Sequence, residues 1–413
     1  MISTSCQYRL LTGGFNAKRM ITMKLKTSLL VLALLFLQCS SDSDDVDMIT
    51  QNQQTTVNPP TSTETTTSAE PTQQTFDRAG MLTFWADQII LPAYGNFVTE
   101  LNEFNNSISA FTQDPSATSL ESLRQQWLEA YGAWQYIEMF DIGPAEELYF
   151  KNRMNIYPAN VDRIEQNISN NEYDLDVSAN FTSQGFSALD YLLFGIADTD
   201  DELQQKLADQ AQNYNTYMVN VTQKMIDLTT SIHTEWQGEY RTAFVASTDN
   251  TATSSINKII NDFVFYFEKG FRANKFGIPA GVFSGGPLPD RIEAYHGQTY
   301  SKLLSIEAHT AIQQFFNGIA FTDNSVTGLS LKAYLDFIES DISDKLSGRI
   351  NAQLQAAKDK INELNINFKT QINQNNTEML LTYDAIQASV VLLKVDMLQK
   401  LNISVDYADA DGD

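Results

Sequence analysis

Apolar side chains recur three or four residues apart along much of the chain, which is the spacing of one face of an α-helix. Three stripes are formed by Leu120, Leu123, Trp127, Tyr131, Trp134 and Ile137, by Leu203, Leu207, Tyr214, Met218, Val221 and Met225, and by Ile256, Ile260, Phe263, Phe267 and Phe271. A fourth helical stretch is expected from Pro289 to Gly318, because glycine suits the position after a helix. Strand-like alternation is rare, so the pattern predicts an all-α protein made of helical bundles.

Two short motifs mark expected helix starts. Thr118 and Glu121 have the spacing of a capping box just before the first stripe, and Thr199 and Glu202 repeat it before the second. The aromatic side chains of the first stripe, with Phe140 after it, are expected in the core rather than on a binding platform.

Two pairs of segments look related. Residues 162–165 and 290–293 share the sequence Asp-Arg-Ile-Glu, and downstream of them residues 185–194 line up with 328–337. Two matches in the same order suggest an internal duplication, with the boundary between the two halves of the chain near residues 240–255.

The N-terminus has the features of an export signal. Residues 1–38 carry five basic residues and no acidic one, and they include an unbroken apolar run from Leu29 to Leu37. Such a run is too short to span a bilayer, and its flanks predict a signal peptide. Translation from Met20 or Met23 would give the signal peptide normal proportions.

Cys39 directly follows the apolar run and resembles the lipidated cysteine of a bacterial lipobox. The following residues, up to residue 75, are rich in Thr, Ser, Gln and Pro and contain no base, so 39–75 is expected to be a lipidated, disordered tether. The folded domain is then 76–413, with halves of about 76–245 and 246–413.

The charge and the residue composition argue against two classes of function. The 413 residues include 51 acidic and 27 basic side chains, which gives a net charge of −24. This charge repels phosphates and argues against a nucleic-acid partner. Three histidines and two cysteines leave little material for a zinc site, and no His-Glu-x-x-His motif is present.

Several motifs together resemble one known family. They are residues 127–134 (WLEAYGAW), 143–145 (GPA), 185–195 (GFSALDYLLFG), 89–94 (IILPAY), 293–296 (EAYH) and 409–413 (DADGD). These segments are similar to the imelysin family over about residues 78–413.

The resemblance implies an all-α fold of two four-helix-bundle-like halves and a cell-envelope protein tied to bacterial iron uptake. The family is named for a peptidase, and some members carry a Gly-x-His-x-x-Glu signature. Gly185 matches its glycine, whereas Ser187 replaces its histidine and Asp190 its glutamate. We therefore take these three residues as candidate ligand-binding residues without catalysis.

Five further residues are candidates for contacts between the two halves or for supporting the candidate ligand-binding residues. Arg163 and Glu165 recur as Arg291 and Glu293 in the duplicated tetrapeptide, so interdomain salt bridges are expected. Glu293 and His296 also have the Glu-x-x-His spacing of di-iron bundles. The equivalent segment of the first half lacks the histidine, which favours an interface pair over a metal pair.

Three functions remain open from the sequence. The leading hypothesis is an outer-membrane lipoprotein, facing the periplasm or the cell surface, with a binding or accessory role in iron acquisition. Its partners would be the membrane, through the lipid, and envelope proteins of iron uptake. A cofactor is not defined by the sequence, although iron or another cation could be held by oxygen ligands. The alternatives are an envelope metallopeptidase and a tethered protein-interaction module.

Overall fold

The computed structural model describes residues 75–407. The expected signal peptide, Cys39, nearly all of the tether and the acidic tail 409–413 lie outside the described residues. Within the described part the chain is helical, and its only β-type pairing is a single bridge between Ile319 and Thr327. The all-α prediction is confirmed.

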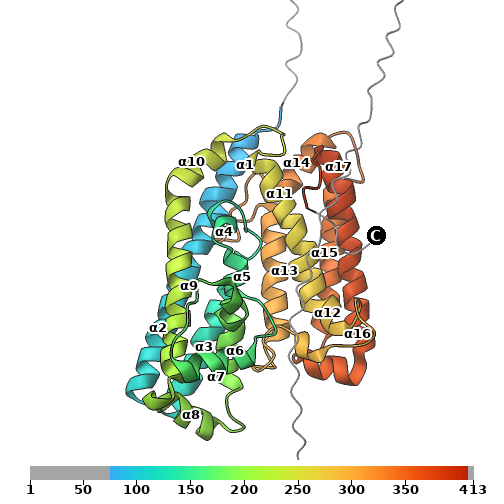
Figure 1. Ribbon diagram of the computed structural model, residues 1–413. Coiled ribbons are helices and arrows are strands. Elements are labelled where there is room, and N and C mark those ends of the chain that lie inside the picture. Colours follow the sequence, from blue (N-terminus) through green and yellow to red (C-terminus); the bar gives the residue numbers. More distant parts are fainter. Residues whose placement is uncertain (1–74, 408–413) are drawn as a thin grey trace, which may run out of the picture. The chain divides into compact units, whose positions relative to one another are not determined.

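The N-terminal half is built around three long helical segments (Figure 1). The first of these is continuous over α1, η1 and α2, and it packs against α3 and α9. The elements of this half are α1 (Arg78–Phe84), η1 (Trp85–Ile90), α2 (Leu91–Gln113), α3 (Ala117–Trp134), α4 (Pro144–Glu147), α5 (Phe150–Met154), α6 (Val161–Asn170), η2 (Ser178–Ser183), α7 (Gly185–Phe194), α8 (Asp200–Ala208), η3 (Gln210–Gln212), α9 (Tyr214–Gln237) and α10 (Glu239–Ala246).

The C-terminal half is a second bundle, in which α16 packs against α15 and η4 while α13 packs against both of these. Residues 247–254 connect it to α10. Its elements are α11 (Ser255–Phe265), η4 (Tyr266–Gly277), α12 (Ile278–Ala280), η5 (Pro289–Arg291), α13 (Ser301–Asn317), α14 (Leu331–Ile338), α15 (Leu346–Glu363), α16 (Phe368–Val390), η6 (Val391–Met397) and α17 (Leu398–Leu401).

Helix starts agree with the sequence in one case and differ in another. Thr199 caps α8, because its hydroxyl accepts a hydrogen bond from the N–H of Glu202 at 3.3 Å. The start expected at Thr118 is wrong: Ser116 is the cap of α3, and its side chain and that of Ser119 each bond the other residue's backbone N–H. Thr118 lies inside the helix.

Two of the expected helical stretches are interrupted. The second stripe is divided between α8 and α9, because residues 209–213 form a short turn in which Asn213 has a φ of +61°. In the stretch from Pro289 to Gly318, a short 3₁₀ helix, η5, is followed by a break, and the long helix α13 begins only at Ser301. Gly318 ends α13 with a φ of +66°, as expected. Residues 292–300 follow an irregular path that belongs to the site described below.

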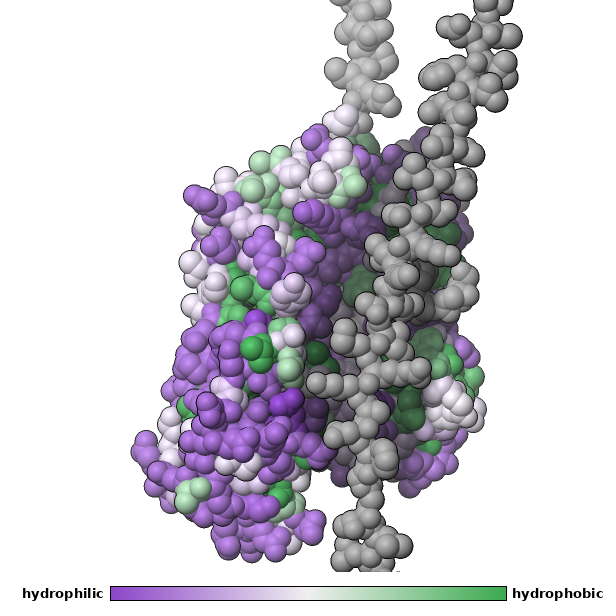
Figure 2. Space-filling model, in the orientation of Figure 1, coloured by the Kyte–Doolittle hydropathy of each residue, from purple (hydrophilic) through white to green (hydrophobic). Residues whose placement is uncertain are grey.

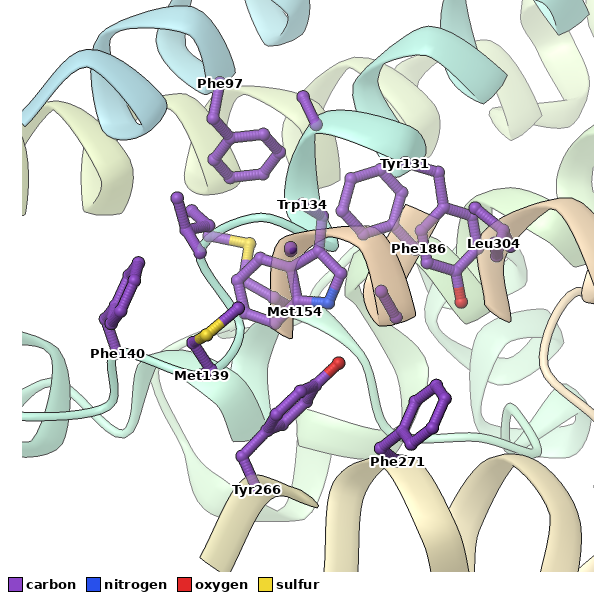
Figure 3. Packing of buried hydrophobic residues seen from close by; sticks show 14 of the residues in the cluster. Phe97, Tyr131, Trp134, Met139, Phe140, Met154, Phe186, Tyr266, Phe271 and Leu304 are labelled. Carbon is purple, nitrogen blue, oxygen red and sulfur yellow. The ribbon is translucent and has the colours of Figure 1, made fainter. Parts of the chain in front are cut away.

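The core and the seam between the halves are aromatic. Trp127, Tyr131, Trp134 and Phe140 are buried, as predicted, and the Tyr131 ring stacks on Phe186 with centroids 4.3 Å apart. Figure 3 shows Tyr266 of η4 pointing from the C-terminal half toward Trp134 of the N-terminal half, with Phe271 of the same element beside it.

The two related tetrapeptides adopt different structures. Residues 162–165 lie in the first turns of α6, whereas residues 290–293 leave the short helix η5 and become extended at Ile292. The similarity of the halves therefore stays a prediction from the sequence.

The visible surface is mostly polar (Figure 2). The face of the described residues that is turned to the viewer in Figure 2 is mainly hydrophilic, with scattered apolar patches. Among residues 75–407 no helix combines the length and the hydropathy that a membrane span requires.

Candidate functional site

Helix α7 starts where two chain segments come close together. Gly185 opens the helix with a φ of +72°, and a Cβ there would lie 2.2 Å from the carbonyl oxygen of Met154. Only glycine fits both the backbone angle and the close approach. Two residues later, the Ser187 hydroxyl donates a hydrogen bond to the carbonyl of Ile156 at 2.6 Å. The start of α7 thus holds the segment that follows α5.

Asp190 holds a segment of the other half. Its two carboxylate oxygens accept hydrogen bonds from the backbone N–H groups of His296 and Gly297, each at 2.8 Å. The side chain is buried, and this burial raises the pKa of Asp190 to about 7, although the two N–H groups act in the opposite direction. Ser187 and Asp190 therefore fasten one segment from each half to the same helix.

A cavity of about 270 Å³, here called the α7 cavity, lies beside these contacts, and its walls include Ser187, Asp190, Tyr157, Tyr295 and His296. Burial and nearby Lys369 lower the pKa of His296 to about 4, so its imidazole is neutral at pH 7. Its ring packs edge-on against Tyr191, with centroids 5.2 Å apart.

A second cavity lies on the other side of residues 155–157, between the N-terminal half and η4. This η4 cavity has a volume of about 310 Å³, and its walls include Glu138, Asp141, Lys151, Ile156, Phe265 and Tyr266. Because Tyr157 lines both cavities, the contacts made by α7 also shape the wall of the η4 cavity.

A buried ion pair of the C-terminal half lies at the seam next to the η4 cavity. The Nζ of Lys275 lies 2.5 Å from Oε2 of Glu293, and their side chains are 1% and 2% exposed. Gln135 and Asn155, from the N-terminal half, donate hydrogen bonds to the other Glu293 oxygen at 3.2 and 2.9 Å. Lys275 also donates to Gln135 at 2.8 Å, so the network joins the two halves in the protein interior.

Glu138 stands between this network and the cavity. Its carboxylate lies 3.9 Å from Lys275. Burial raises the pKa of Glu138 to about 7; Lys275 opposes the rise and Glu293 adds to it. Oε2 of Glu138 and the hydroxyl of Tyr266 are both buried and make no well-aligned hydrogen bond within the protein, although the two groups are near enough to affect each other's pKa.

The other residues singled out from the sequence are placed differently. Arg163 donates to Gln166 in its own helix, and Glu165 accepts hydrogen bonds from Tyr191 and Tyr214, so both stay within the N-terminal half. Arg291 reaches the wall of the η4 cavity and lies 3.6 Å from Asp290. Of Arg163, Glu165, Arg291 and Glu293, the described contacts show Glu293 alone making hydrogen bonds to the other half.

The residues around the α7 motif do not fit a metal ion. Both Asp190 oxygens already accept backbone hydrogen bonds, and the Ser187 hydroxyl already donates to a carbonyl. Across residues 75–407, moreover, no three His, Cys, Asp or Glu side chains are grouped as metal ligands. The arrangement positions backbone segments and leaves no acid–base pair free.

Sequence reasoning missed the residues that surround Glu293. Gln135, Asn155, Glu138 and Tyr266 belong to no motif, so no local signal identifies them. Lys275 had a usable signal, since it continues the four-residue spacing of Phe267 and Phe271 and so places a charge on an apolar helix face.

The sequence model of the imelysin family matches residues 90–394, which is most of the chain. The chain belongs to the imelysin family.

Other comparisons agree with this imelysin assignment. Iron-regulated protein A of Synechococcus elongatus is 28% identical over 110 residues, a segment that covers 27% of this chain and 30% of that relative. Two solved structures share the fold at 18% identity: a protein of Parabacteroides distasonis, provisionally named an iron-regulated protein A precursor, and an imelysin-like protein of Psychrobacter arcticum. Their TM-scores are 0.66 and 0.61, over 81% and 80% of this chain and 97% of each structure.

Proposed function

We propose that this imelysin-family chain is an exported lipoprotein of the bacterial envelope, with a binding rather than catalytic role in an iron-related process. The contacts of α7 support the binding role. Ser187 stands where the family signature has histidine, and Asp190 is engaged by two backbone N–H groups. The motif therefore lines the α7 cavity and holds Ile156 in the wall of the η4 cavity, and no base or nucleophile in it is free.

The iron-related role rests on family membership and on the name of the Synechococcus relative. The envelope location rests on the signal-like residues 1–38 and on Cys39, whose lipid would anchor the protein to the membrane. On this proposal the partners are envelope proteins of iron uptake.

A deletion strain tests the iron role. It should grow more slowly than its parent in chelator-treated medium and contain less iron, while both strains grow equally when iron is abundant. The wild-type gene should restore growth, whereas the Cys39→Ser variant should restore it less well, because the protein would lose its anchor. Normal growth and unchanged cellular iron in the deletion strain under iron limitation would contradict the proposal.

An envelope peptidase is the second candidate. The observation that favours it is the Asp190 carboxyl group, whose pKa of about 7 suits proton transfer near neutral pH. The purified mature chain should be offered a broad peptide library with and without a chelator. Cleavage that the chelator stops, and that Asp190→Asn abolishes in a protein that still folds, would establish the peptidase. No cleavage is expected.

A further inference from the structure

The η4 cavity contains hydrogen-bonding atoms that the protein leaves unused. Oε2 of Glu138 and the Tyr266 hydroxyl are buried and make no well-aligned hydrogen bond within the protein, and Tyr266 is only 4% exposed. The two groups lie close enough to shift each other's pKa, and Oε2 of Glu138 is 3.9 Å from Lys275. A buried polar atom without a partner costs about 1–3 kcal/mol. Native structures rarely keep two of them at one cavity unless something else, such as water or a ligand, satisfies them.

The basic groups of the same wall already have acidic partners. Lys151 lies 2.7 Å from Asp141 and over the ring of Phe265, and Lys269 lies 3.3 Å from Glu268. Arg291 is paired with its neighbour Asp290, and Lys275, behind the wall, is paired with Glu293. The unmet hydrogen-bonding capacity of the cavity therefore belongs to carboxylate oxygens of Glu138 and Asp141 and to the Tyr266 hydroxyl, which can also accept.

The secondary structure of the wall is unusual in a way that fits a binding site. Residues 266–277 form the π-helix η4, which supplies Tyr266, Lys269, Gly270 and Asn274 to the cavity. Stretches of π-helix are rare and occur frequently at functional sites. The wall also has apolar and aromatic side chains, among them Phe265, Tyr157, Ile156 and Ile278.

We propose that the η4 cavity binds a small organic molecule through a protonated amino group, which donates hydrogen bonds to Glu138 and Tyr266. The apolar body of the ligand packs on Phe265 and Ile156, and the aromatic rings favour a cation beside them. A volume of about 310 Å³ matches a small ligand of this kind. This inference names the ligand class of the binding role proposed above, and it rests on that role.

Other occupants fit less well. A carboxylate or phosphate ligand would meet Glu138, while the lysines of the wall are already paired with Asp141 and Glu268. A bare metal ion needs several oxygen, nitrogen or sulfur ligands, and residues 75–407 offer no group of three suitable side chains. Water alone remains an outcome of the test.

The test uses the purified mature protein and three probes of one shape. Fluorine NMR at pH 7.5 would follow titrations with 4-fluorobenzylamine, 4-fluorobenzyl alcohol and 4-fluorobenzoate. The amine should bind one-to-one, and at least about tenfold more tightly than the other two, since a charge-assisted hydrogen bond contributes about 1.5–3 kcal/mol. Equal binding of the three probes, or no saturable binding of the amine, would overturn the proposal in favour of a water-filled cavity.

Two variants place the binding at this cavity. Glu138→Gln should weaken amine binding about tenfold or more, and Tyr266→Phe should weaken it several-fold. Because the Tyr266 hydroxyl makes no well-aligned hydrogen bond within the protein, Tyr266→Phe should keep the thermal unfolding temperature of the wild type. Tyr149→Phe and Glu129→Gln, which remove a hydroxyl and a carboxylate outside the cavity walls, should leave amine binding unchanged.

Unaltered amine affinity in both cavity variants would also overturn the proposal. Its failure can be told apart from failure of the iron role. If the deletion strain grows poorly under iron limitation but the purified protein does not bind the amine, only the ligand class is excluded. A deletion strain without any iron phenotype would exclude the iron role whatever the amine does.

Discussion

Asp190 illustrates how single side chains shape this molecule. The signature glutamate is replaced by a residue one methylene shorter, and its carboxylate binds two main-chain N–H groups of the other half. Gly185 is equally specific, because its positive φ and its contact with Met154 exclude a side chain. The sequence singled out both residues, but the partners of Asp190 lie more than a hundred positions away and have no local signature.

Asp190 should make the stability of the fold depend on pH. Its folded-state pKa of about 7 lies above the usual value of 3.8, so the native protein binds more protons than the unfolded chain between these pH values. Stability should therefore fall as the pH rises from about 4 to 7, by at most about 1.4 kcal/mol per pH unit for this group, and then level off.

Thermal unfolding of the wild type and Asp190→Asn between pH 5 and pH 8 measures this effect. The unfolding temperature of the variant should fall less steeply with rising pH than that of the wild type. Part of the fall should remain, because burial also raises the pKa values of Glu138 and Asp262. Asp227→Asn, which removes an exposed carboxylate, should leave the slope as it is in the wild type. Parallel curves for wild type and Asp190→Asn would show that Asp190 does not titrate in this range.

At the scale of helices, apolar periodicity found the long elements but not their interruptions. Residues 292–300 stay out of α13 because Asp190 binds the N–H groups of His296 and Gly297, and because Ala294 and Gln298 take φ values of +54° and +52°. This cause is tertiary, so local sequence could not reveal it. The sequence similarity of residues 162–165 and 290–293 did not predict which contacts they make, because those contacts also depend on distant parts of the chain.

The two Thr-x-x-Glu motifs offer a matched test of helix capping. Thr199→Ala should destabilise the protein by about 0.5–2 kcal/mol, because it removes the acceptor for the Glu202 N–H. Thr118→Ala should be neutral or slightly stabilising, because Thr118 lies inside α3 and alanine has the higher helix propensity. Denaturant unfolding measures both, and equal losses would contradict the caps assigned here.

Over the whole described domain, the halves are joined by an interior that is polar as well as apolar. The Lys275–Glu293 pair is buried, so removing one partner leaves an uncompensated charge without water. We expect Lys275→Met to cost about 3–5 kcal/mol of unfolding free energy. Combining it with Glu293→Gln should cost less than the sum of the two single changes, by about 1–3 kcal/mol.

Chemical denaturation of the three variants gives this coupling directly. The exposed pair Lys360–Glu363, with a separation of 2.6 Å, is the control, and the same substitutions there should change stability little. Additive losses at Lys275 and Glu293 would mean that the buried pair contributes no more than two independent side chains.

The Lys275–Glu293 network has a consequence for cutting the chain. Residues 247–254 form the connection between the two bundles, and several of its side chains are exposed, so a protease can reach it. The C-terminal fragment would carry the ion pair, the N-terminal fragment would carry its hydrogen-bond partners Gln135 and Asn155, and each would keep one side of the aromatic seam. The fragments should therefore stay associated as one particle and melt together, and neither should fold when it is made without the other.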